Sequence, residues 1–324
     1  MNGMPVQVVV VGSYNQDHVW QVDRFPQPGE TRRGKGFATG PGGKGFNQAV
    51  ACARQGVATA FIAARGDDVL GRSAARRAEV EGIEGHWQVR TDQPTGTAAI
   101  LVNADGQNQI IVHLAANEAL DPDFLRAQQS VLSGSRVLLT QMENNIDATR
   151  AALALGRAQG VLCVLNPAPV HPDLDPELMM LSDVLVPNES EFAQLCQRFL
   201  DQAPATHAIA AMDDAQLHAL ARQLVKGSLV ITLGRQGCFV SHGADRRGDA
   251  ADCYRVAAES VHAIDTTGAG DAFCGALAAG LADRHADAFA QAVRQAGRVA
   301  ALSTERRGAA DAMPSREQVL SRFD

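Results

Sequence analysis

The residues best suited to chemistry lie in a glycine-rich stretch at 262–277, His-Ala-Ile-Asp-Thr-Thr-Gly-Ala-Gly-Asp-Ala-Phe-Cys-Gly-Ala-Leu. Apolar residues recur with helical spacing in its second half, which predicts a turn that opens a helix. We expect Thr266 or Thr267 to be the N-cap of this helix. The residues that follow have almost no side chains, so their backbone N–H groups are open to a ligand and form an anion site: Gly268, Ala269 and Gly270.

Asp271 would lie in the first turn of that helix, beside the anion site. An acid in this position is unfavourable for binding an anion alone, but it can take a proton from a hydroxyl that then attacks a phosphate. The other interpretation is that Asp271 only complements the helix dipole, because acidic residues are common in first turns. The stretch by itself leaves both interpretations open.

A second glycine-rich segment, residues 40–47, has the sequence Gly-Pro-Gly-Gly-Lys-Gly-Phe-Asn. It matches the pattern G-x-G-x-x-G, but it does not directly follow the first predicted strand, which argues against a dinucleotide-binding fingerprint. It is also not a P-loop, because Gly45 follows Lys44 where Ser or Thr is required. We expect a flexible turn that delivers Lys44 and Asn47 to a polar ligand, with a plain loop as the alternative.

Six polar residues share a predicted location at, or just past, the carboxyl ends of strands: Asn15, Asp17, Glu143, Asn166, Asn188 and Thr232. Each has a simpler local explanation, such as an Asx turn or, for Asn188 with Glu191, a helix capping box. Open α/β sheets bind ligands in the crevice at the carboxyl ends of their strands. Because six such residues coincide there, we predict a binding site at this edge, which Asp271 would join.

The elements that must position these residues alternate between strand and helix. Continuous apolar runs predict buried parallel strands, and the alternation predicts a doubly wound, mostly parallel α/β sheet flanked by helices. The expected strands span 6–11, 58–63, 136–140, 161–165, 183–186 and 229–232, with edge strands at 238–241 and 254–257. The expected helices span 47–55, 119–133, 146–159, 176–181, 188–199, 213–226, 269–283 and 286–302, and another ends near residue 81.

The whole chain, 1–324, is expected to form a single domain. Short strand-like pieces at about 15–40 and 86–113 would form one small antiparallel sheet beside the main sheet. Residues 201–212 are predicted to be a loop insertion.

Composition excludes several classes of function. The chain has 324 residues, 46% of them hydrophobic, and a formal net charge of −7, so a nucleic-acid backbone is not an expected partner. No apolar run approaches 18 residues, so we expect no membrane span, and the first residues lack the charged start of a signal peptide. The six cysteines form no C-x-x-C pair, which is typical of reduced core residues in a cytoplasmic protein.

These motifs together resemble the ribokinase/PfkB family of sugar kinases, over about residues 6–315. Residues 42–49, Gly-Gly-Lys-Gly-Phe-Asn-Gln-Ala, are similar to the first family signature, and residues 265–277 are similar to the second. Further matches lie at 12–17, 66–68, 141–143, 166–169, 187–191 and 232–237. The resemblance implies a ribokinase-like fold with a small β-sheet lid, and transfer of the γ-phosphate of ATP to a primary hydroxyl.

The resemblance also implies roles for the matching residues. Asp271 would be the general base, with the amides of residues 268–271 as the anion hole. The sugar-binding positions are matched by Asn15, Asp17, Gly42, Gly43, Lys44, Asn47 and Glu143. The nucleotide-binding positions are matched by Asn188, Thr232, Gly234, Arg235, Gln236, Gly237 and Gly270. Glu191 matches a residue that helps to place Mg²⁺ through water, and the positions of a monovalent K⁺ site are matched by Asp265, Thr267, Ser303, Arg306 and Gly308.

The lid of this family closes on the sugar and commonly pairs two subunits, which implies a homodimer. Ala98 and Ile100 alternate on one face of a strand and would pack on the sugar ring or form ordinary sheet core. The chain departs from the family at Phe46, where a small residue is usual, and at 114–117, where a glycine is usual. These departures would reshape the sugar pocket, whereas Ala312, where a side-chain hydroxyl is expected, bears on K⁺ binding.

The leading hypothesis from the sequence is therefore phosphorylation of ribose to ribose 5-phosphate. Alternatives are a related kinase for another furanose, such as fructose, or for a nucleoside, although the low aromatic content of 5% argues against a nucleoside. A non-catalytic sugar-binding regulator is a further alternative, against which an intact Asp271 and a complete anion hole both argue. A nicotinamide-dependent dehydrogenase is remote, because the G-x-G-x-x-G match is misplaced.

Overall fold

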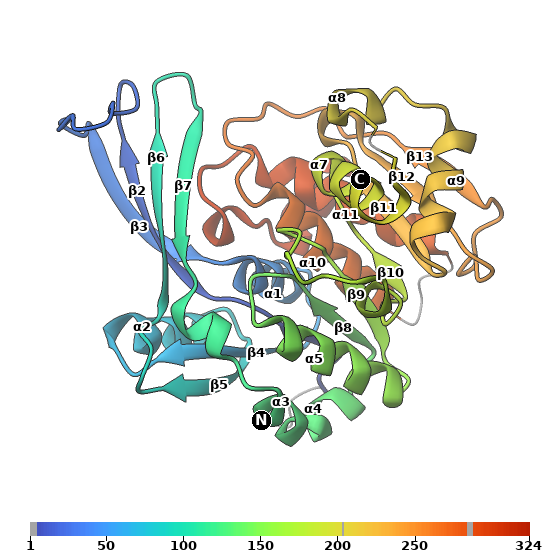
Figure 1. The fold of residues 1–324 in the computed structure, drawn as a ribbon, viewed down its shortest axis with the longest axis horizontal. Coiled ribbons are helices and arrows are strands. Elements are labelled where there is room, and N and C mark those ends of the chain that lie inside the picture. The colour runs from blue at the N-terminus through green and yellow to red at the C-terminus, as the bar shows by residue number, and fades with distance from the viewer. Residues whose placement is uncertain (1–4, 203, 284–287) are drawn as a thin grey trace.

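The protein is built on a nine-stranded sheet, seen in a computed structural model that describes residues 5–202, 204–283 and 288–324. The strand order is β13-β12-β11-β10-β9-β8-β1-β4-β5 (Figure 1). The strands are β1 (Val8–Val11), β4 (Thr59–Gly66), β5 (Glu84–Arg90), β8 (Val137–Thr140), β9 (Leu162–Leu165), β10 (Val184–Leu185), β11 (Ser228–Thr232), β12 (Cys238–Ser241) and β13 (Cys253–Val256). All pairings are parallel except those of β12 and β13, which confirms the doubly wound, mostly parallel sheet.

Alternate side chains of the central strands pack into two separate hydrophobic cores, one on each face of the sheet. Val8 and Val10 of β1 pack into one, and Val9 and Val11 pack into the other. The first core is covered by α1 (Lys44–Arg54), α2 (Val69–Val80), α10 (Ala269–Ala282), α11 (Phe289–Ser303) and α12 (Arg316–Phe323). The second is covered by α3 (Pro122–Ala127), α4 (Gln129–Ser133), α5 (Ile146–Ala158), α6 (Pro176–Met179), α7 (Glu189–Leu200), α8 (Thr206–Ile209) and α9 (Asp214–Leu224). The result is three layers, with helices on both faces of the sheet.

A separate four-stranded sheet, which we call the lid, projects from one side of the main sheet (Figure 1). Its order is β3-β2-β6-β7, from β2 (Asn15–Gln21), β3 (Gly36–Gly42), β6 (Gly96–Val102) and β7 (Asn108–His113). The prediction of an antiparallel sheet was wrong at its centre, because β2 and β6 run parallel. Since the chain passes through β4, α2 and β5 between these two strands, they are joined by a crossover and not by a hairpin.

The predicted lid boundary at residue 86 was also wrong. β5 pairs in parallel with β4 of the main sheet, in a register from Ala60 with Glu84 to Gly66 with Arg90. Helix α2 makes the crossover between them, which is the usual way to join neighbouring parallel strands. The second lid segment therefore begins at Gly96.

Three further elements differ from the sequence prediction. Helix α1 begins at Lys44, three residues earlier than predicted. The helix predicted over 119–133 is split into a 3₁₀ turn at Ala115–Ala119, then α3 and α4 on either side of Gln128. The predicted loop insertion at 201–212 contains α8, and the predicted start of a helix at 286 lies outside the described residues. No helix in the described ranges is both long and apolar enough to cross a membrane.

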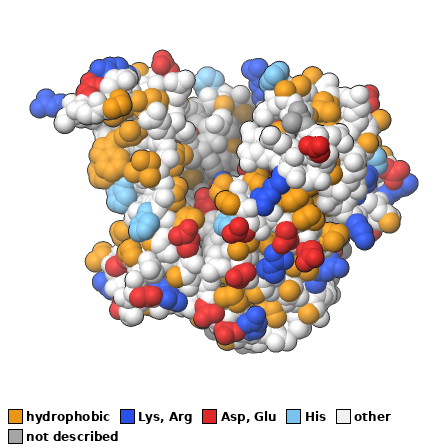
Figure 2. Space-filling view, in the orientation of Figure 1, with side chains coloured by type: hydrophobic (Ala, Val, Ile, Leu, Met, Phe, Trp, Pro, Cys, Tyr) orange, Lys and Arg blue, Asp and Glu red, His pale blue; other side chains and the backbone are white. Residues whose placement is uncertain are grey.

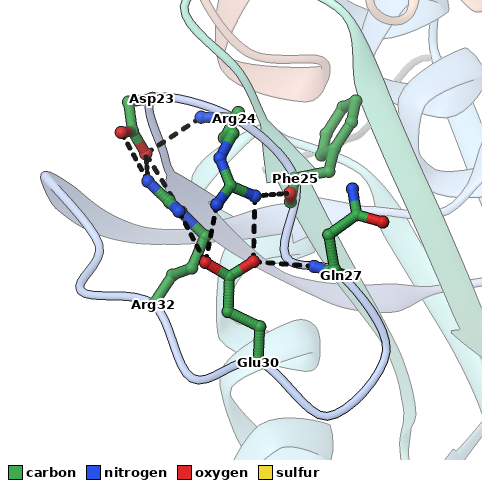
Figure 3. Close-up of polar contacts among 6 residues, drawn as sticks. All are labelled: Asp23, Arg24, Phe25, Gln27, Glu30 and Arg32. Carbon is green, nitrogen blue, oxygen red and sulfur yellow. Dashed lines mark hydrogen bonds and ion pairs between the residues drawn. The ribbon is translucent and has the colours of Figure 1, made fainter.

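The tip of the lid between β2 and β3 is held by an exposed network of ion pairs (Figure 3). Arg24 makes two bonds to Glu30, at 2.9 and 2.7 Å, and Arg32 reaches both Glu30 and Asp23. Glu30 also accepts the backbone N–H of Gln27 at 2.9 Å. The loop thus has defined internal contacts, with Arg32 and Glu30 partly buried between the more exposed Asp23 and Arg24.

Candidate active site

The N-terminus of α10 presents bare backbone amides. Its N-cap is Gly268, with φ 75°, and no side chain caps the helix, so the predicted caps Thr266 and Thr267 were wrong. Gly268 suits this position because its φ is left-handed and a Cβ atom there would lie 3.1 Å from Ala309. The Ala269 amide donates to the Thr266 carbonyl at 3.2 Å.

Three of the four predicted anion-hole amides remain open. The amides of Gly268, Gly270 and Asp271 have no backbone acceptor among the described residues. A Cβ atom at Gly270 would meet no atom within 4 Å, so open space faces this residue. Uncapped amides at the positive end of a 14-residue helix are suited to binding phosphate oxygens.

Asp271 is only 7% exposed, and two amides of α1 hold its carboxylate. Asn47 Nδ2 donates to Oδ2 at 2.9 Å, and Gln48 Nε2 donates to Oδ1, also at 2.9 Å. These contacts fix the direction of the carboxylate at the mouth of the anion site. A carboxylate fixed in this way can accept a proton from a hydroxyl that approaches along the open side.

The turn that opens α1 is packed tightly against the end of β1. Its N-cap, Gly43, has φ 87°, and a Cβ atom at Gly45 would lie 2.5 Å from Cα of Gly12. The Lys44 amide donates to Oε2 of Glu143 at 3.0 Å, and Ser13 Oγ donates to the same oxygen at 2.7 Å. Glu143 thus anchors the turn, and the glycines serve close packing of backbone on backbone.

Lys44 and the acidic residues form one charged cluster. Burial opposes the positive charge of Lys44, but Asp271, Glu143 and Glu191 outweigh it and raise the pKa of the ammonium. Burial raises the pKa of Asp17 to about 7, with further contributions from the charges of Glu143 and Asp271. No hydrogen bond within the described part of the chain involves the Asp17 carboxylate, which lies over Gly42. It is therefore ready to accept hydroxyl donors from a ligand.

The side chain of Asn117 holds the start of the lid strand β2 in place. It accepts the Tyr14 N–H at 3.0 Å and donates to the Tyr14 carbonyl at 3.0 Å and to Oδ1 of Asn15 at 3.1 Å. Asn15 is 2% exposed, and its Nδ2 has no partner among the described residues. These contacts fix the Asn15 amide with its donor end available to a ligand.

A second group of predicted residues lies along the same sheet edge. Asn188 and Glu191 form a capping box on α7, as their spacing predicted, and both Glu191 oxygens accept bonds from Asn188. Asn188 also forms a parallel bridge with Thr232, the last residue of β11. The exposed turn after it holds the predicted residues Gly234, Arg235, Gln236 and Gly237.

The residues matched to the cation site come together behind the anion hole. The Gly308 amide donates to Oδ2 of Asp265 at 3.0 Å, and the Thr267 amide donates to Oδ1 at 2.9 Å. Ser303 is buried, and its hydroxyl donates to the Ala300 carbonyl, whereas Arg306 is exposed. Ala312 is buried within a 3₁₀ turn at Ala310–Ala312.

The structure places both departures from the family pattern, and of the two only Phe46 is shown to lie away from the pocket. Phe46 is fully buried and packs edge-on against Tyr14 and Phe61, with ring centroids 5.2 and 5.8 Å away, so it fills core and not pocket. In the segment 114–117, Ala115 takes the left-handed conformation, φ 47°, that a glycine would adopt. Ala98 and Ile100 are buried on the same face of the lid sheet as Asp17.

The structure therefore brings most of the predicted residues to one edge of the sheet, beside a deep hollow between the lid and the rest of the molecule (Figure 2). Sequence reasoning missed the positioning contacts made by Ser13, Gln48, Asn117 and Gln141. Gln48, Ser13 and Gln141 do lie within the segments that resemble the family, and this was the signal that could have singled them out. No cluster of three or more His, Cys, Asp or Glu side chains suited to a metal ion occurs among the described residues.

The sequence is similar to those of known carbohydrate kinases. Residues 6–316 match the profile described as pfkB family carbohydrate kinase. The chain is 34% identical to a Haemophilus influenzae ribokinase over 315 residues, covering 97% of both chains, and 36% identical to a mouse ribokinase, covering 96% and 93%. A Salmonella typhimurium deoxyribokinase is 30% identical, covering 97% of both.

Solved structures show the same fold. The structure of ribokinase from Giardia lamblia has a TM-score of 0.84 at 28% identity and covers 99% of this chain and all of that one. The structure of Arabidopsis thaliana ribokinase complexed with ribose and ATP has a TM-score of 0.79 at 27% identity and covers 98% of both chains. The similarity thus extends over the lid, the main sheet and the site edge.

Proposed function

This chain belongs to the pfkB family of carbohydrate kinases, and from that premise we propose that it is an ATP-dependent ribokinase that converts D-ribose and ATP to D-ribose 5-phosphate and ADP. The observation that carries the proposal is Asp271, held by Asn47 and Gln48 beside the open amides of α10. A binding protein needs an anion site but no base beside it. A kinase needs both.

In the proposed reaction, the Asp271 carboxylate takes the proton of the primary hydroxyl of the sugar as its oxygen attacks the γ-phosphorus of ATP. The bond between that phosphorus and the β,γ-bridging oxygen breaks, and ADP leaves. The amides of Gly268, Gly270 and Asp271 hold the negative charge of the transferring group. Lys44, close to Asp271 and Glu191, adds a positive charge at the same place.

The sugar is proposed to lie between the lid and the turn that opens α1. Asp17 accepts from its hydroxyls, while Asn15 donates from Nδ2 and Glu143 accepts with the oxygen that Ser13 and Lys44 leave free. Backbone at Gly42 and Gly43 borders this space. Ala98 and Ile100, on the Asp17 face of the lid, pack against the ring when the lid closes and excludes water.

The nucleotide is proposed to bind along Asn188, Thr232 and the exposed turn at 234–237. Mg²⁺ would bind with the phosphates of ATP, where it neutralises charge while retaining several waters. Glu191 fits a contact through water, because its two oxygens already accept bonds from Asn188.

A K⁺ site is proposed next to the anion hole. The bond from Gly308 to Asp265 joins the two loops that would supply carbonyl oxygens, including those of Thr267, Ser303 and Arg306. Ala312 offers no hydroxyl, so the site depends on carbonyls and on Asp265. Rate measurements with K⁺, and with tetramethylammonium as a non-binding control, test this site.

We also propose a homodimer that forms through the outer face of the lid, opposite Asp17. The register of β3-β2-β6-β7 places Trp20, Phe37 and Ile111 on that face, exposed by 37%, 58% and 76%. Figure 2 shows hydrophobic side chains gathered over this part of the lid. Phe37→Glu and Ile111→Glu should give monomers in analytical ultracentrifugation, whereas Val80→Glu, equally exposed on α2, should leave the assembly unchanged.

The compartment is proposed to be the cytoplasm. All six cysteines are free thiols, and five of them are buried. Reduced thiols of this kind are typical of cytoplasmic proteins.

The first experiment is ADP release from Mg·ATP with ribose, 2-deoxyribose, fructose and several nucleosides, with and without K⁺, for wild type and Asp271→Asn. Strong ribose-dependent turnover that the substitution lowers by about 10²–10⁴-fold is the expected result. Turnover with another acceptor alone would keep the mechanism and replace the substrate. Sugar binding by calorimetry without turnover on any acceptor would favour a non-catalytic regulator.

A further inference from the structure

A chain of buried side-chain amides leads from the sheet edge to Asp271. Asn166 Nδ2 donates to the Val186 carbonyl at 2.8 Å, and Gln48 Nε2 donates to Oδ1 of Asn166 at 3.2 Å. Gln141 Nε2 donates to Oε1 of Gln48 at 2.7 Å. The same Gln48 Nε2 then donates to Asp271 at 2.9 Å, and both Gln48 and Gln141 are 0% exposed.

The direction of this chain is fixed at its far end. A side-chain amide can turn by 180°, which exchanges its donor and its acceptor. The Val186 carbonyl can only accept, so Asn166 must present Nδ2 to it and Oδ1 to Gln48. Gln48 must then present its donor to Asn166 and to Asp271, and its acceptor to Gln141.

Keeping this direction leaves one polar atom without a partner. Gln141 uses Nε2 for Gln48, and its own Oε1 is buried without a hydrogen bond among the described residues. That oxygen lies against Gly12, where a Cβ atom would come within 2.3 Å. A buried polar atom without a partner is unfavourable. Gln141 therefore keeps the orientation in which Nε2 donates to Gln48, although its own Oε1 is left without a hydrogen bond.

We infer that Gln48 is a positioning residue for the base Asp271, and that Gln141 and Asn166 fix the direction in which Gln48 donates. This inference rests on the proposed function, because it takes Asp271 as the base. Asn47 alone would hold one oxygen of Asp271 and leave the carboxylate free to turn about that contact. Gln48 holds the other oxygen from inside the protein, where no ligand reaches it.

The test compares Gln48→Met, Gln141→Met and the double variant with wild type. Methionine has the length of glutamine without its hydrogen bonds. Gln55→Met is the matched control, because Gln55 is also buried and is the C-cap of α1, and because its side-chain amide donates to the Pro314 carbonyl at 2.9 Å. Steady-state kcat and KM for ATP and sugar are measured with the acceptor that wild type uses best, and thermal unfolding is recorded for each variant.

We expect Gln48→Met to lower kcat by about 10- to 100-fold, with both KM values within about 3-fold of wild type, because misplacement of a reacting group acts on the transition state. Gln141→Met should lower kcat by about 3- to 10-fold alone and have no further effect in the Gln48→Met background. Gln55→Met should change unfolding but keep kcat within 2-fold. A KM effect without a kcat effect, multiplicative losses in the double variant, or an equal loss in Gln55→Met would overturn the inference.

Two safeguards keep the test decisive. If Gln48→Met does not fold, Gln141→Met alone tests the inference. A loss of kcat below 2-fold in Gln141→Met would contradict the role given to the chain of amides. Crystal structures of Gln141→Met and Gln55→Met give a readout that needs no turnover. We expect a turned or doubled Gln48 amide and Asp271 carboxylate in the first and neither in the second, and an unchanged pair in both would reject the inference even if ribose is not the substrate.

Discussion

The side chain of Asn47, at the start of α1, donates from Nδ2 to Oδ2 of Asp271, 2.9 Å away and 224 residues later in the sequence. The family resemblance assigned Asn47 to the sugar, yet half of its amide is engaged with the base. Its Oδ1 is buried without a partner among the described residues. In the proposed reaction, Asn47 therefore holds the carboxylate that removes the proton of the acceptor hydroxyl.

This contact predicts the effect of replacing Asn47 with aspartate. Asn47→Asp keeps the shape and the acceptor oxygen but sets two carboxylates 2.9 Å apart. Two carboxylates at this distance cannot both ionise, so they share one proton and Asp271 is no longer free to accept the proton of the hydroxyl. We therefore expect kcat to fall by about 100-fold or more at pH 7. Steady-state kinetics measure the change, with Asn145→Asp as the control, since Asn145 is the N-cap of α5 and aspartate caps equally well.

The raised pKa of Asp17, about 7, predicts that sugar binding depends on pH. Above pH 7 the carboxylate is ionised and accepts from hydroxyls with both oxygens, whereas below pH 7 it is protonated. We expect the Kd for sugar to rise about tenfold from pH 8 to pH 6, and binding at pH 7 to release a fraction of a proton. Calorimetry in buffers of different ionisation enthalpy measures both quantities. Asp17→Asn should remove the dependence, and a variant that keeps it would assign the titration to another group.

The same pKa shift has a consequence for stability. The native Asp17 binds a proton up to about pH 7, whereas in the unfolded chain it loses the proton near 3.8. Between these values the native state binds more protons, so this residue's contribution to stability falls as the pH rises through that window. Denaturant unfolding at pH 5 and pH 8 should show Asp17→Asn gaining stability relative to wild type at the higher pH. Equal differences at both pH values would contradict the shift.

Much of this fold follows from local patterns. The buried parallel strands can be predicted because each is a continuous apolar run in the sequence. The capping box of Asn188 with Glu191 is also a local feature, and the structure confirms it. The placement of β5 is different, because its residues suit either sheet and only the crossover through α2 decides between them. Periodicity identifies elements but not their neighbours.

The site was predicted as a location more accurately than as a set of contacts. Polar residues at strand ends meet at one edge because parallel strands share a direction, so their assembly follows from topology. The partner of each side chain depends on rotamers and on segments far away in the chain, as with Asn117 and Tyr14. Phe46 shows the limit most clearly, since it lies between Lys44 and Asn47 but points into the core.

Adding one methyl group should affect stability differently at the two glycines of the proposed anion hole, Gly268 and Gly270. Gly268 has a left-handed φ and crowded surroundings, so Gly268→Ala should lower the free energy of unfolding by about 1–2 kcal/mol. Gly270 faces open space within the helix, so Gly270→Ala should keep or slightly raise the unfolding temperature. Its methyl group would instead enter the phosphate site and raise KM for ATP or lower kcat. Thermal unfolding and kinetics on the pair separate the two effects, and a Gly270→Ala variant with unchanged kinetics would show that the phosphates bind elsewhere.

Asn188 has a structural role that the structure shows and a nucleotide-binding role that is proposed, and two substitutions separate them. Its side chain accepts the Glu191 N–H at 2.9 Å as the N-cap of α7, and Nδ2 donates to Oε1 of Glu191 at 2.9 Å. Serine is an equally good N-cap but has no amide donor, whereas alanine caps poorly and costs about 1 kcal/mol. We therefore expect Asn188→Ser to unfold near the wild-type temperature and Asn188→Ala to unfold about 1–2 °C lower.

The kinetics of these two variants then address the nucleotide. If Asn188 binds ATP or holds Glu191 toward it, both variants should raise KM for ATP by about 5- to 20-fold while KM for the sugar stays constant. A purely capping residue would give wild-type kinetics in Asn188→Ser and a change only in Asn188→Ala, in proportion to its lost stability. The serine variant is decisive because it keeps the cap and removes only the amide that joins Asn188 to the Glu191 carboxylate.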